Sequence, residues 1–456
     1  MLRYFSPGVW LLVLLAIGSS ILVQLLPVKP RPGIIFWLFD RNHAMLSEHI
    51  AAQWNRENPA NPVQVTLLNG AAMNSRMLTG FYADTPVGDL IEVERSVIGQ
   101  IFAGPLDNVG FVDLTNRLKN ERVGDLINTP SFSPWTTRGR IFGLPHDVHP
   151  VMLMYRADLT EAAGIDVAQI ETWHDFFRVM RPLMGDLDGD GRVDRWLLSG
   201  GPTAQQFHEV FMLQAGGGYF DRNGEPALNS EINVRIISQL ATWYAGPGRV
   251  TGELPTTPVT AQQLIIQGYV AAMFAPDWYA GSVRNSLPSM AGKFKLMPLP
   301  AWEPGGRRTS VFGGTMLGLT KASQQQNAAW EFAKKLYLSP ETAKGLYEVT
   351  RIITPIKSNW DESVYDEPDP YYCDQPIGRL YINLAPDVPT RPSSPFYGNA
   401  QQELNAAVIA LCRYTEANAI TDPTRLHAQC RQLLDAAHAG LLRQMQRNVF
   451  LRNPAP

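Results

Sequence analysis

Short apolar segments alternate along most of the chain with segments of helical spacing, and this alternation limits the fold more than any other feature of the sequence. Residues 33–39 and 63–68 have the composition of strands, and residues 46–55 between them carry apolar side chains at helical intervals. Further apolar strands follow at 151–155 and 315–319. Strands that alternate with helices build sheets covered by helices. The sequence therefore predicts an α/β protein.

The length and charge of the chain narrow this prediction. A single hydrophobic core stops growing near ~250–300 residues. A chain of 456 residues is therefore expected to contain at least two lobes. Its net charge of −3 at pH 7 argues against a general nucleic-acid binder, which would carry a basic excess. Cys373, Cys412 and Cys430 are too few for a disulfide scaffold, and pairing of the last two stays open.

The N-terminus carries an apolar segment from Val9 to Leu26 without a charged residue. About 20 apolar residues span a bilayer, whereas a secretory signal has an apolar core of roughly 7–15 residues before a small-residue cleavage site. We therefore expect residues 1–32 to hold one uncleaved N-terminal transmembrane helix, a signal anchor, followed by a Pro-rich spacer. A cleaved signal and a buried core helix are the alternatives.

A search for catalytic motifs returns none that is complete. His208 and Glu209 begin a zinc-protease pattern, but Met212 stands where the second metal-binding histidine must lie. The sequence also lacks a Gly-x-Ser-x-Gly elbow, a phosphate-binding loop and a Cys-x-x-Cys pair. Glu92 and Glu94 lie two residues apart at a strand end, where they could form the paired carboxylates of a glycosidase. We nevertheless expect no catalytic residue and no cofactor for activity.

One acidic loop matches much of a calcium-binding pattern. Close carboxylates repel one another unless a hard cation joins them. The residues expected around a structural Ca²⁺ are Asp186, Asp188, Asp190, Arg192 and Asp194. Leu197 stands where an EF-hand has its bidentate glutamate, so a polar surface turn without metal is the alternative.

Local signals also place individual helices and loops. Thr172 and Asp175 form a capping-box variant at the start of a helix. Residues 359–395 hold many Pro, Asp and Tyr residues, which indicates a loop. Asp422 and Pro423 begin an amphipathic helix. Its apolar stripe, expected in the core, comprises Leu426, Cys430, Leu433, Leu434, Ala437, Leu441 and Met445.

Several segments occur in an order that resembles a known family. The most specific are GRIFGLPHDVHPVMLMYRADLTEAAGI at 139–165, GYVAAMFAPDWYAG at 268–281 and FGGTMLGLTKAS at 312–323. Each segment is weak alone, but together they resemble the extracellular solute-binding proteins of ABC importers. The branch is family 1, which includes maltose- and oligosaccharide-binding proteins, and the resemblance covers nearly all of residues 33–450.

The resemblance implies a two-lobe, periplasmic-binding-protein-like fold of type II, with an inter-lobe hinge and a ligand cleft. Lobe 1 would comprise residues 33–148 plus 301–353, and lobe 2 would comprise 149–300 plus 354–456. Residues 359–395 depart from the family in their length and in their Tyr and Pro content, and we expect them to cap one side of the cleft. The resemblance implies a binder that passes its ligand to ABC permease subunits, without nucleic acid. Most members of the family are free in the periplasm or lipid-anchored, and this chain departs from them: its apolar segment predicts anchoring in the bacterial inner membrane, with the binding domain on the periplasmic side.

The resemblance also implies which residues contact the ligand, a sugar or an oligosaccharide. Trp278 matches the position where sugar-binding members stack an aromatic ring on the apolar face of a pyranose. Other aromatic and polar positions follow the first strands and the first crossing between the lobes. The implied ligand-binding residues are Asp40, Arg41, Glu94, Arg95, Asp147, His149, Phe207, Trp278, Gly313, Gly314, Phe396 and Tyr397.

Two other functions stay open on the sequence. A glycan-active enzyme would use Glu92 or Glu94 on the same kind of fold. A ligand sensor module would pass occupancy of the cleft to a membrane partner. We find no kinase or signalling domain in this sequence, so such a partner is expected to be a separate chain.

Overall fold

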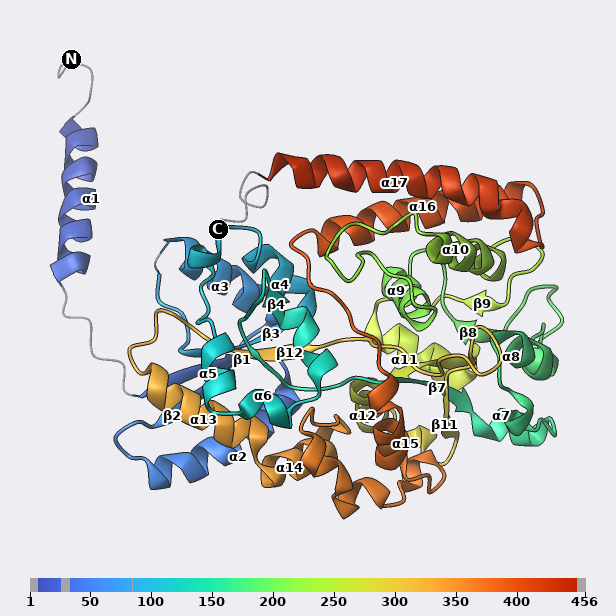
Figure 1. The fold of residues 1–456 in the computed structure, drawn as a ribbon, viewed down its shortest axis with the longest axis horizontal. Helices are drawn as coiled ribbons and strands as arrows, with labels where there is room; N and C mark the ends of the chain where they lie inside the picture. Colours follow the sequence, from blue (N-terminus) through green and yellow to red (C-terminus); the bar gives the residue numbers. More distant parts are fainter. Residues whose placement is uncertain (1–6, 26–32, 84, 449–456) are drawn as a thin grey trace.

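In the computed structural model, which describes residues 7–25, 33–83 and 85–448, the strands form two larger sheets, one in each of two lobes (Figure 1). The first sheet has the order β2–β1–β3–β12–β6, with β1 parallel to both neighbours and β12 antiparallel to β3. Its strands are β1 (Ile34–Leu38), β2 (Val63–Leu67), β3 (Leu90–Glu94), β6 (Leu144–Pro145) and β12 (Thr315–Leu319).

Helices cover both faces of the first sheet, because successive residues of a strand point to opposite sides. Phe36 packs into a core with Trp330 of α13, and the next residue, Trp37, packs into the opposite core with Met77 of α3. The helices of this lobe are α2 (Arg41–Glu57), α3 (Gly70–Ala83), α4 (Arg95–Ile101), α5 (Thr115–Asn120), α6 (Val123–Leu126), α13 (Gln326–Leu338) and α14 (Pro340–Thr350).

The second sheet has the order β11–β7–β10–β8–β9, and its strands β7 and β10 are buried on both faces. Strand β7 is antiparallel to both β10 and β11. The strands are β7 (Val151–Arg156), β8 (Trp196–Ser199), β9 (Thr251–Gly252), β10 (Val270–Pro276) and β11 (Phe294–Pro298). A small hairpin, β4 (Thr136–Thr137) with β5 (Arg140–Ile141), precedes them in the chain.

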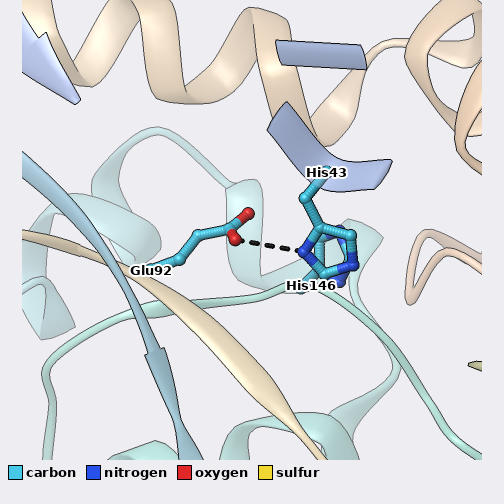
Figure 2. A group of neighbouring side chains, drawn as sticks. All are labelled: His43, Glu92 and His146. Carbon is cyan, nitrogen blue, oxygen red and sulfur yellow. Dashed lines mark hydrogen bonds and ion pairs between the residues drawn. The ribbon is translucent and has the colours of Figure 1, made fainter. Parts of the chain in front are cut away.

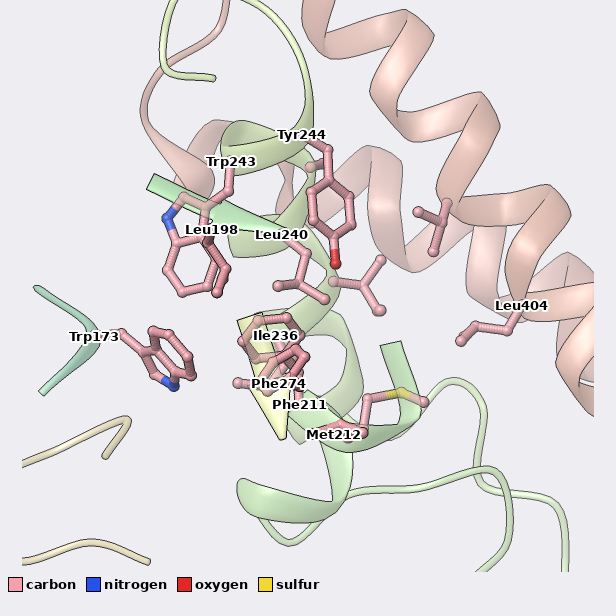
Figure 3. Close-up of a cluster of buried hydrophobic side chains, with 14 of the residues drawn as sticks. Trp173, Leu198, Phe211, Met212, Ile236, Leu240, Trp243, Tyr244, Phe274 and Leu404 are labelled. Atoms are coloured by element: carbon pink, nitrogen blue, oxygen red, sulfur yellow. The ribbon is translucent and has the colours of Figure 1, made fainter. Parts of the chain in front are cut away.

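Aromatic rings fill much of the core on one face of the second sheet (Figure 3). The ring centroids of Trp173 and Phe211 lie 5.2 Å apart, and those of Phe211 and Phe274 lie 5.0 Å apart. Such edge-to-face and tilted contacts stabilise beyond area burial alone. The helices of this lobe are α7 (Ala157–Ala162), α8 (Trp173–Met180), α9 (Gln205–Gln214), α10 (Glu231–Tyr244), α11 (Pro258–Gln267), α12 (Asp277–Ser286), α15 (Ile377–Leu384), α16 (Tyr397–Ala417) and α17 (His427–Arg447).

The two C-terminal helices, α16 and α17, lie side by side on the second lobe (Figure 1). The predicted apolar stripe of α17 is confirmed: its residues from Leu426 to Leu441 are buried, apart from Leu433, which like Met445 is partly buried against the same core. Cys412 and Cys430 are buried free thiols and do not pair in this structure.

The chain passes between the lobes at residues 146–150, 313–314 and 351–356. Residues 301–312, expected in the first lobe, instead form hydrogen bonds with the second. The Ala301 N–H donates to the Glu171 carbonyl (2.8 Å), and the Val151 N–H donates to the Ser310 carbonyl (3.1 Å). This segment therefore turns back beside β7 before it crosses.

Residues 359–395, expected to be a loop that caps the cleft, are instead largely part of the core of the second lobe. Tyr365, Tyr372 and Tyr381 are fully buried in it, and α15 lies within this segment. The hydroxyl of Tyr372 donates to the Ala280 carbonyl (2.7 Å), and that of Tyr381 donates to the Ala275 carbonyl (2.9 Å). These bonds allow the polar ends of Tyr372 and Tyr381 to lie inside the protein, whereas the Tyr365 hydroxyl has no hydrogen-bond partner within the described residues.

The N-terminal apolar segment forms α1 (Pro7–Leu25), whose side chains are exposed over residues 8–21. Among the described residues, neither α1 nor another helix is long and apolar enough to cross a membrane. This is the segment for which a transmembrane helix was expected. The expected Pro-rich spacer falls mostly on residues 26–32, which lie outside the described residues.

Candidate ligand site at the lobe junction

A small cavity lies where the two lobes meet, beside the crossings of the chain. Its volume is about 20 Å³, which is room for one water molecule. Four residues that were predicted to contact ligand line it together. These four are Asp147, His149, Gly313 and Gly314, and the other polar or aromatic lining residues are Ser131, Ser133, Trp135 and Arg391.

His149 organises the hydrogen bonds around this cavity. It is buried in a left-handed backbone conformation (φ 54°). Its Nε2 lies 2.8 Å from Asp147 Oδ2, and its Nδ1 lies 2.5 Å from Asp277 Oδ1. The two carboxylates also accept backbone N–H groups, Asp147 from Thr315 (3.1 Å) and Asp277 from Ile353 (2.8 Å). His149 lies in the first crossing, Thr315 directly follows the second, and Ile353 lies in the third. Through its two carboxylate partners, the His149 side chain therefore connects all three crossings.

The charge of His149 follows from these neighbours. Burial disfavours a charged imidazole, but the carboxylates of Asp147 and Asp277 outweigh it and raise the pKa of His149 to about 10. Burial likewise favours the neutral carboxyl of Asp147, but His149 and His146 outweigh it and hold its pKa well below the usual range. At neutral pH the ring is therefore an imidazolium between two carboxylates, and both of its N–H groups are used inside the protein.

Three aromatic rings, Phe207, Trp278 and Phe312, form a connected surface that we call the aromatic wall. The ring of Phe312 lies 5.9 Å from that of Phe207 and 5.6 Å from that of Trp278, between centroids. The indole N–H of Trp278 donates to the Phe312 carbonyl (3.1 Å). All three residues are half-buried, and Phe207 and Phe312 also pack against the large core of the second lobe. A Cβ on Gly313 would lie 2.8 Å from the Trp278 Nε1, so the wall adjoins the junction cavity.

Four further side chains form a buried network between the lobes, which we call the junction network: Arg95, Glu209, Arg391 and Tyr397. The Nε of Arg391 donates to Glu209 Oε1 (3.0 Å), its Nη2 pairs with Glu209 Oε2, and the Tyr397 hydroxyl also donates to Oε2 (2.7 Å). Arg95 of the first lobe lies over the Tyr397 ring at 4.2 Å. Burial raises the pKa of Glu209, but the two guanidinium groups outweigh it and lower the pKa overall.

Arg95 has hydrogen-bonding capacity that the protein does not use. Its Nη2 lies 3.7 Å from Glu209 Oε1, and its guanidinium is 4% exposed. Within the described residues, its Nε and Nη1 have no hydrogen-bond partner. Buried polar atoms are rarely left without a partner, so these two donors are an exception within the described residues.

The remaining predicted ligand residues have structural roles or lie apart. Asp40 is the N-cap of α2, and Glu94 is the N-cap of α4, where it accepts the Ser96 N–H (3.0 Å). Arg41 is exposed at the first position of α2. Phe396 is buried in the large core of the second lobe. The structure does not bring these four side chains to the junction cavity.

Glu92 and Glu94, the pair that a glycosidase would need, have unlike surroundings. Glu92 is 1% exposed, accepts a hydrogen bond from the Tyr337 hydroxyl (2.8 Å) and lies 3.1 Å from His43 Nδ1. Glu94 is partly exposed as a helix cap. The pair is thus divided between the interior of the first lobe and a helix terminus.

The acidic loop brings three of its predicted ligands together. One carboxylate oxygen each from Asp186, Asp188 and Asp194 lies within 4.8 Å of the others. Backbone N–H groups already donate to these oxygens, for example Gly191 to Asp186 (2.7 Å). Leu197 is buried in β8 and offers no ligand. The neighbouring predicted residues Asp190 and Arg192 bond to each other, since Asp190 Oδ1 accepts the Arg192 N–H (2.8 Å).

Sequence reasoning missed four residues of the junction, of which two lie directly beside predicted ligand residues. Asp277 directly precedes Trp278, and Phe312 directly precedes Gly313. Glu209 was considered only within an incomplete zinc-protease pattern, and Arg391 lay in the segment assigned as loop. Contacts between residues far apart in the chain, and not a local pattern, bring these side chains together.

Comparisons with known proteins agree with this architecture. A family model described as bacterial extracellular solute-binding protein matches residues 44–344. An arabinooligosaccharide-binding protein of Halalkalibacterium halodurans is 26% identical over 344 residues, which is 74% of this chain and 75% of the relative. A protein of the same name from Bacillus subtilis is 25% identical over 327 residues, covering 69% and 71%.

Solved structures show the same fold at low identity. The sugar-binding protein MalE of Xanthomonas citri superposes with a TM-score of 0.73 at 17% identity, covering 92% of this chain and 100% of that one. A cyclo/maltodextrin-binding protein complexed with maltotetraose superposes with a TM-score of 0.67 at 17% identity, covering 92% and 99%. The predicted two-lobe α/β fold is confirmed. The chain belongs to the bacterial extracellular solute-binding protein family.

Proposed function

We propose that this chain binds an oligosaccharide at the lobe junction and delivers it to the permease of an ABC importer. The observation that carries the proposal is the aromatic wall, three half-buried rings beside a cavity lined by charged and hydroxyl groups. An aromatic face suits the apolar C–H side of a sugar ring, while polar side chains around it suit the hydroxyl groups.

The unpaired donors of Arg95 support the same ligand class. Its Nε and Nη1 can donate to sugar oxygens, and neither has a partner among the described residues. Gly313 and Gly314 have φ values of 98° and 128°, which favour glycine and leave the backbone accessible beside the cavity. The names of the curated relatives favour an oligosaccharide over a monosaccharide.

The size of the junction cavity supports a role for lobe movement. A cavity of about 20 Å³ cannot hold a sugar ring, so the lobes have to separate before a ligand enters. We assign this structure to a closed arrangement, with the hinge at residues 146–150, 313–314 and 351–356. Hinge closure around a ligand is a common device of two-lobe binding proteins.

The proposal is tested by isothermal titration calorimetry of the chain with arabino-oligosaccharides, malto-oligosaccharides and monosaccharides. We expect binding of one oligosaccharide class, and Trp278→Ala should weaken it at least about tenfold, the equivalent of ~1.4 kcal/mol. The control Trp278→Phe keeps an aromatic face and should lose less. Unchanged affinity in Trp278→Ala, or no binding of any sugar, would contradict the proposal.

We infer that the chain is a binder and catalyses no reaction on its ligand. The family consists of solute-binding proteins, and Glu92 is enclosed by His43 and Tyr337 inside the first lobe. Incubation with the oligosaccharide found by calorimetry should leave it intact. Turnover that disappears in Glu92→Gln or Glu94→Gln would instead support the enzyme alternative.

The uncharged segment 9–26 would direct export of the chain, as expected for a member of a family of extracellular proteins. We propose that this segment stays attached as a membrane anchor, which would keep the binder close to its permease. N-terminal sequencing of the protein from bacterial cells tests this. A mature N-terminus beyond residue 26 would show a cleaved signal.

A further inference from the structure

A second group of buried polar side chains lies inside the first lobe. His43 on α2, Glu92 on β3 and His146 after β6 point toward one another (Figure 2), and we call them the His–Glu cluster. They are 7%, 1% and 6% exposed. One nitrogen or carboxylate oxygen from each lies within 4.8 Å of the others.

The separations within the His–Glu cluster suit a single bound ion. A tetrahedral zinc ion with bonds of about 2.0–2.1 Å holds neighbouring ligand atoms roughly 3.3 Å apart. His43 Nδ1 and Glu92 Oε2 are hydrogen-bonded at 3.1 Å, and the rings of His43 and His146 lie 4.4 Å apart between centroids. A zinc ion bound here would replace the proton of this hydrogen bond. Two imidazoles and a glutamate form a ligand set that proteins use for zinc, and nitrogen ligands disfavour calcium and magnesium.

Neighbouring groups hold the cluster in place from outside. The Tyr337 hydroxyl donates to Glu92 Oε1 (2.8 Å), which leaves Oε2 to face His43. His146 Nδ1 lies 3.3 Å from Asp147 Oδ2, so its Nε2 remains for an ion. Metal-bound histidines commonly make such a bond from their second nitrogen to a carboxylate, and it sets the orientation of the ring.

A cavity of about 20 Å³ adjoins all three side chains. Apart from them it is lined by apolar residues such as Leu336 and Leu346, and by the polar residues Ser47, Tyr337, Thr342 and Thr354. This volume accommodates one ion or one water molecule. The cluster therefore has both the ligand atoms and the space that a small ion requires.

We propose that His43, Glu92 and His146 bind a structural Zn²⁺, with the fourth coordination position directed toward this cavity. The ion would join α2 to β3 and to the segment 146–150, the first crossing between the lobes. It would stabilise the first lobe whichever solute the junction takes, so the site does not depend on the proposed sugar ligand.

The test uses the full chain, purified without a polyhistidine tag and stripped of metal with EDTA. Zn²⁺ alone should bind with one tight site per chain, measured by elemental analysis after dialysis, and should raise the melting temperature by a few degrees. Co²⁺ in place of Zn²⁺ should give the visible absorption of a tetrahedral site. A folded wild-type chain that retains no Zn²⁺ and gives no such Co²⁺ spectrum would overturn the proposal.

Variants locate the site. His43→Gln and His146→Gln should each weaken Zn²⁺ binding at least about a hundredfold, since even outer-shell changes cost 10–100-fold. His49→Gln changes an exposed histidine of the same helix and should bind like the wild type. Asp186→Asn changes the acidic loop and leaves the His–Glu cluster intact, so it is the control for Zn²⁺ binding by that loop. Wild-type affinity in both His43→Gln and His146→Gln would overturn the assignment, and if either fails to fold, the wild-type Co²⁺ spectrum decides.

Discussion

The His–Glu cluster of the first lobe and the junction network between the lobes differ in the kind of atoms that they can offer to a bound molecule. In the junction network both oxygens of Glu209 accept hydrogen bonds, and the unused capacity is a pair of donors on Arg95. In the His–Glu cluster both oxygens of Glu92 also have partners, the Tyr337 hydroxyl and His43 Nδ1, and the three side chains offer possible metal ligands beside a small cavity. Unpaired donors suit the oxygens of a solute, whereas two imidazoles and a carboxylate suit a metal cation that replaces the proton between His43 and Glu92. The comparison thus assigns the two clusters to different ligands.

The largest expected effect comes from breaking the junction network. Glu209→Gln leaves Arg391 and Arg95 buried without a compensating charge, and guanidinium groups do not lose their protons. We expect a loss of about 3–5 kcal/mol in the free energy of unfolding, measured by urea denaturation. Zn²⁺ binding should not change in the fraction that folds, because Glu209 has no partner in the His–Glu cluster.

The matched control is Glu231→Gln, which breaks an ion pair with Arg431 in which the glutamate is 79% exposed. Exposed pairs contribute about 0–1 kcal/mol, so this variant should be close to the wild type. Equal losses in the two variants would show that burial does not increase the contribution of the junction network to the free energy of unfolding.

The pH dependence of the free energy of unfolding tests how much the charge on His149 stabilises the junction. The pKa of His149 is about 10 in the folded chain and about 6.5 in the unfolded chain. At a pH between these two values, the folded chain therefore keeps a proton on His149 that the unfolded chain has lost. Its contribution to stability is complete below pH ~6.5 and is lost as the pH rises through ~10. We expect it to exceed ~1.4 kcal/mol, the equivalent of one pKa unit.

Urea denaturation of the wild type and His149→Gln across this pH range measures the effect. The difference in stability between the two chains should shrink as the pH rises, whereas His49→Gln should follow the wild type at every pH. A difference that stays constant from pH 6.5 to 10 would mean that the proton on His149 contributes nothing.

A methyl group at the junction tests how closely the lobes meet there. Gly313→Ala puts a Cβ 2.8 Å from Trp278 Nε1 and 3.1 Å from His149 Cδ2 in a left-handed backbone conformation (φ 98°). We expect a loss of about 1–3 kcal/mol by thermal denaturation, together with weaker sugar binding. Gly305→Ala is the control, since its φ is also positive (72°) but nothing lies within 4 Å of the new Cβ. Equal losses would assign the whole effect to backbone strain.

The smallest expected effect concerns the exposed acidic loop. If Asp186, Asp188 and Asp194 bind Ca²⁺, adding Ca²⁺ alone to the EDTA-treated chain should raise the melting temperature slightly, by mass action on the folded state. Asp186→Asn should abolish this rise, and His43→Gln should preserve it. An identical melt with EDTA and with excess Ca²⁺ would leave a polar turn whose carboxylates accept only backbone N–H groups.

Much of the local structure could be predicted from the sequence, because the pattern that encodes it is local. The capping box of Thr172 and Asp175 is present, with the hydroxyl and the carboxylate each accepting the backbone N–H of the other residue. The segment 359–395 shows the limit of such patterns. Its composition resembles a loop, yet Tyr372 and Tyr381 are buried, and carbonyl groups distant in the chain accept their hydroxyls.

The sequence by itself determined the α/β alternation, the apolar stripe of α17 and the family, and it indicated that Asp147, His149, Trp278 and the two glycines belong to one site. Only the tertiary structure decided which charges meet. Glu209 pairs with Arg391 across 182 residues, and His149 pairs with Asp277 across 128. Such pairs leave no periodic signal in the chain, and burial makes their energies depend on neighbours that only folding assembles.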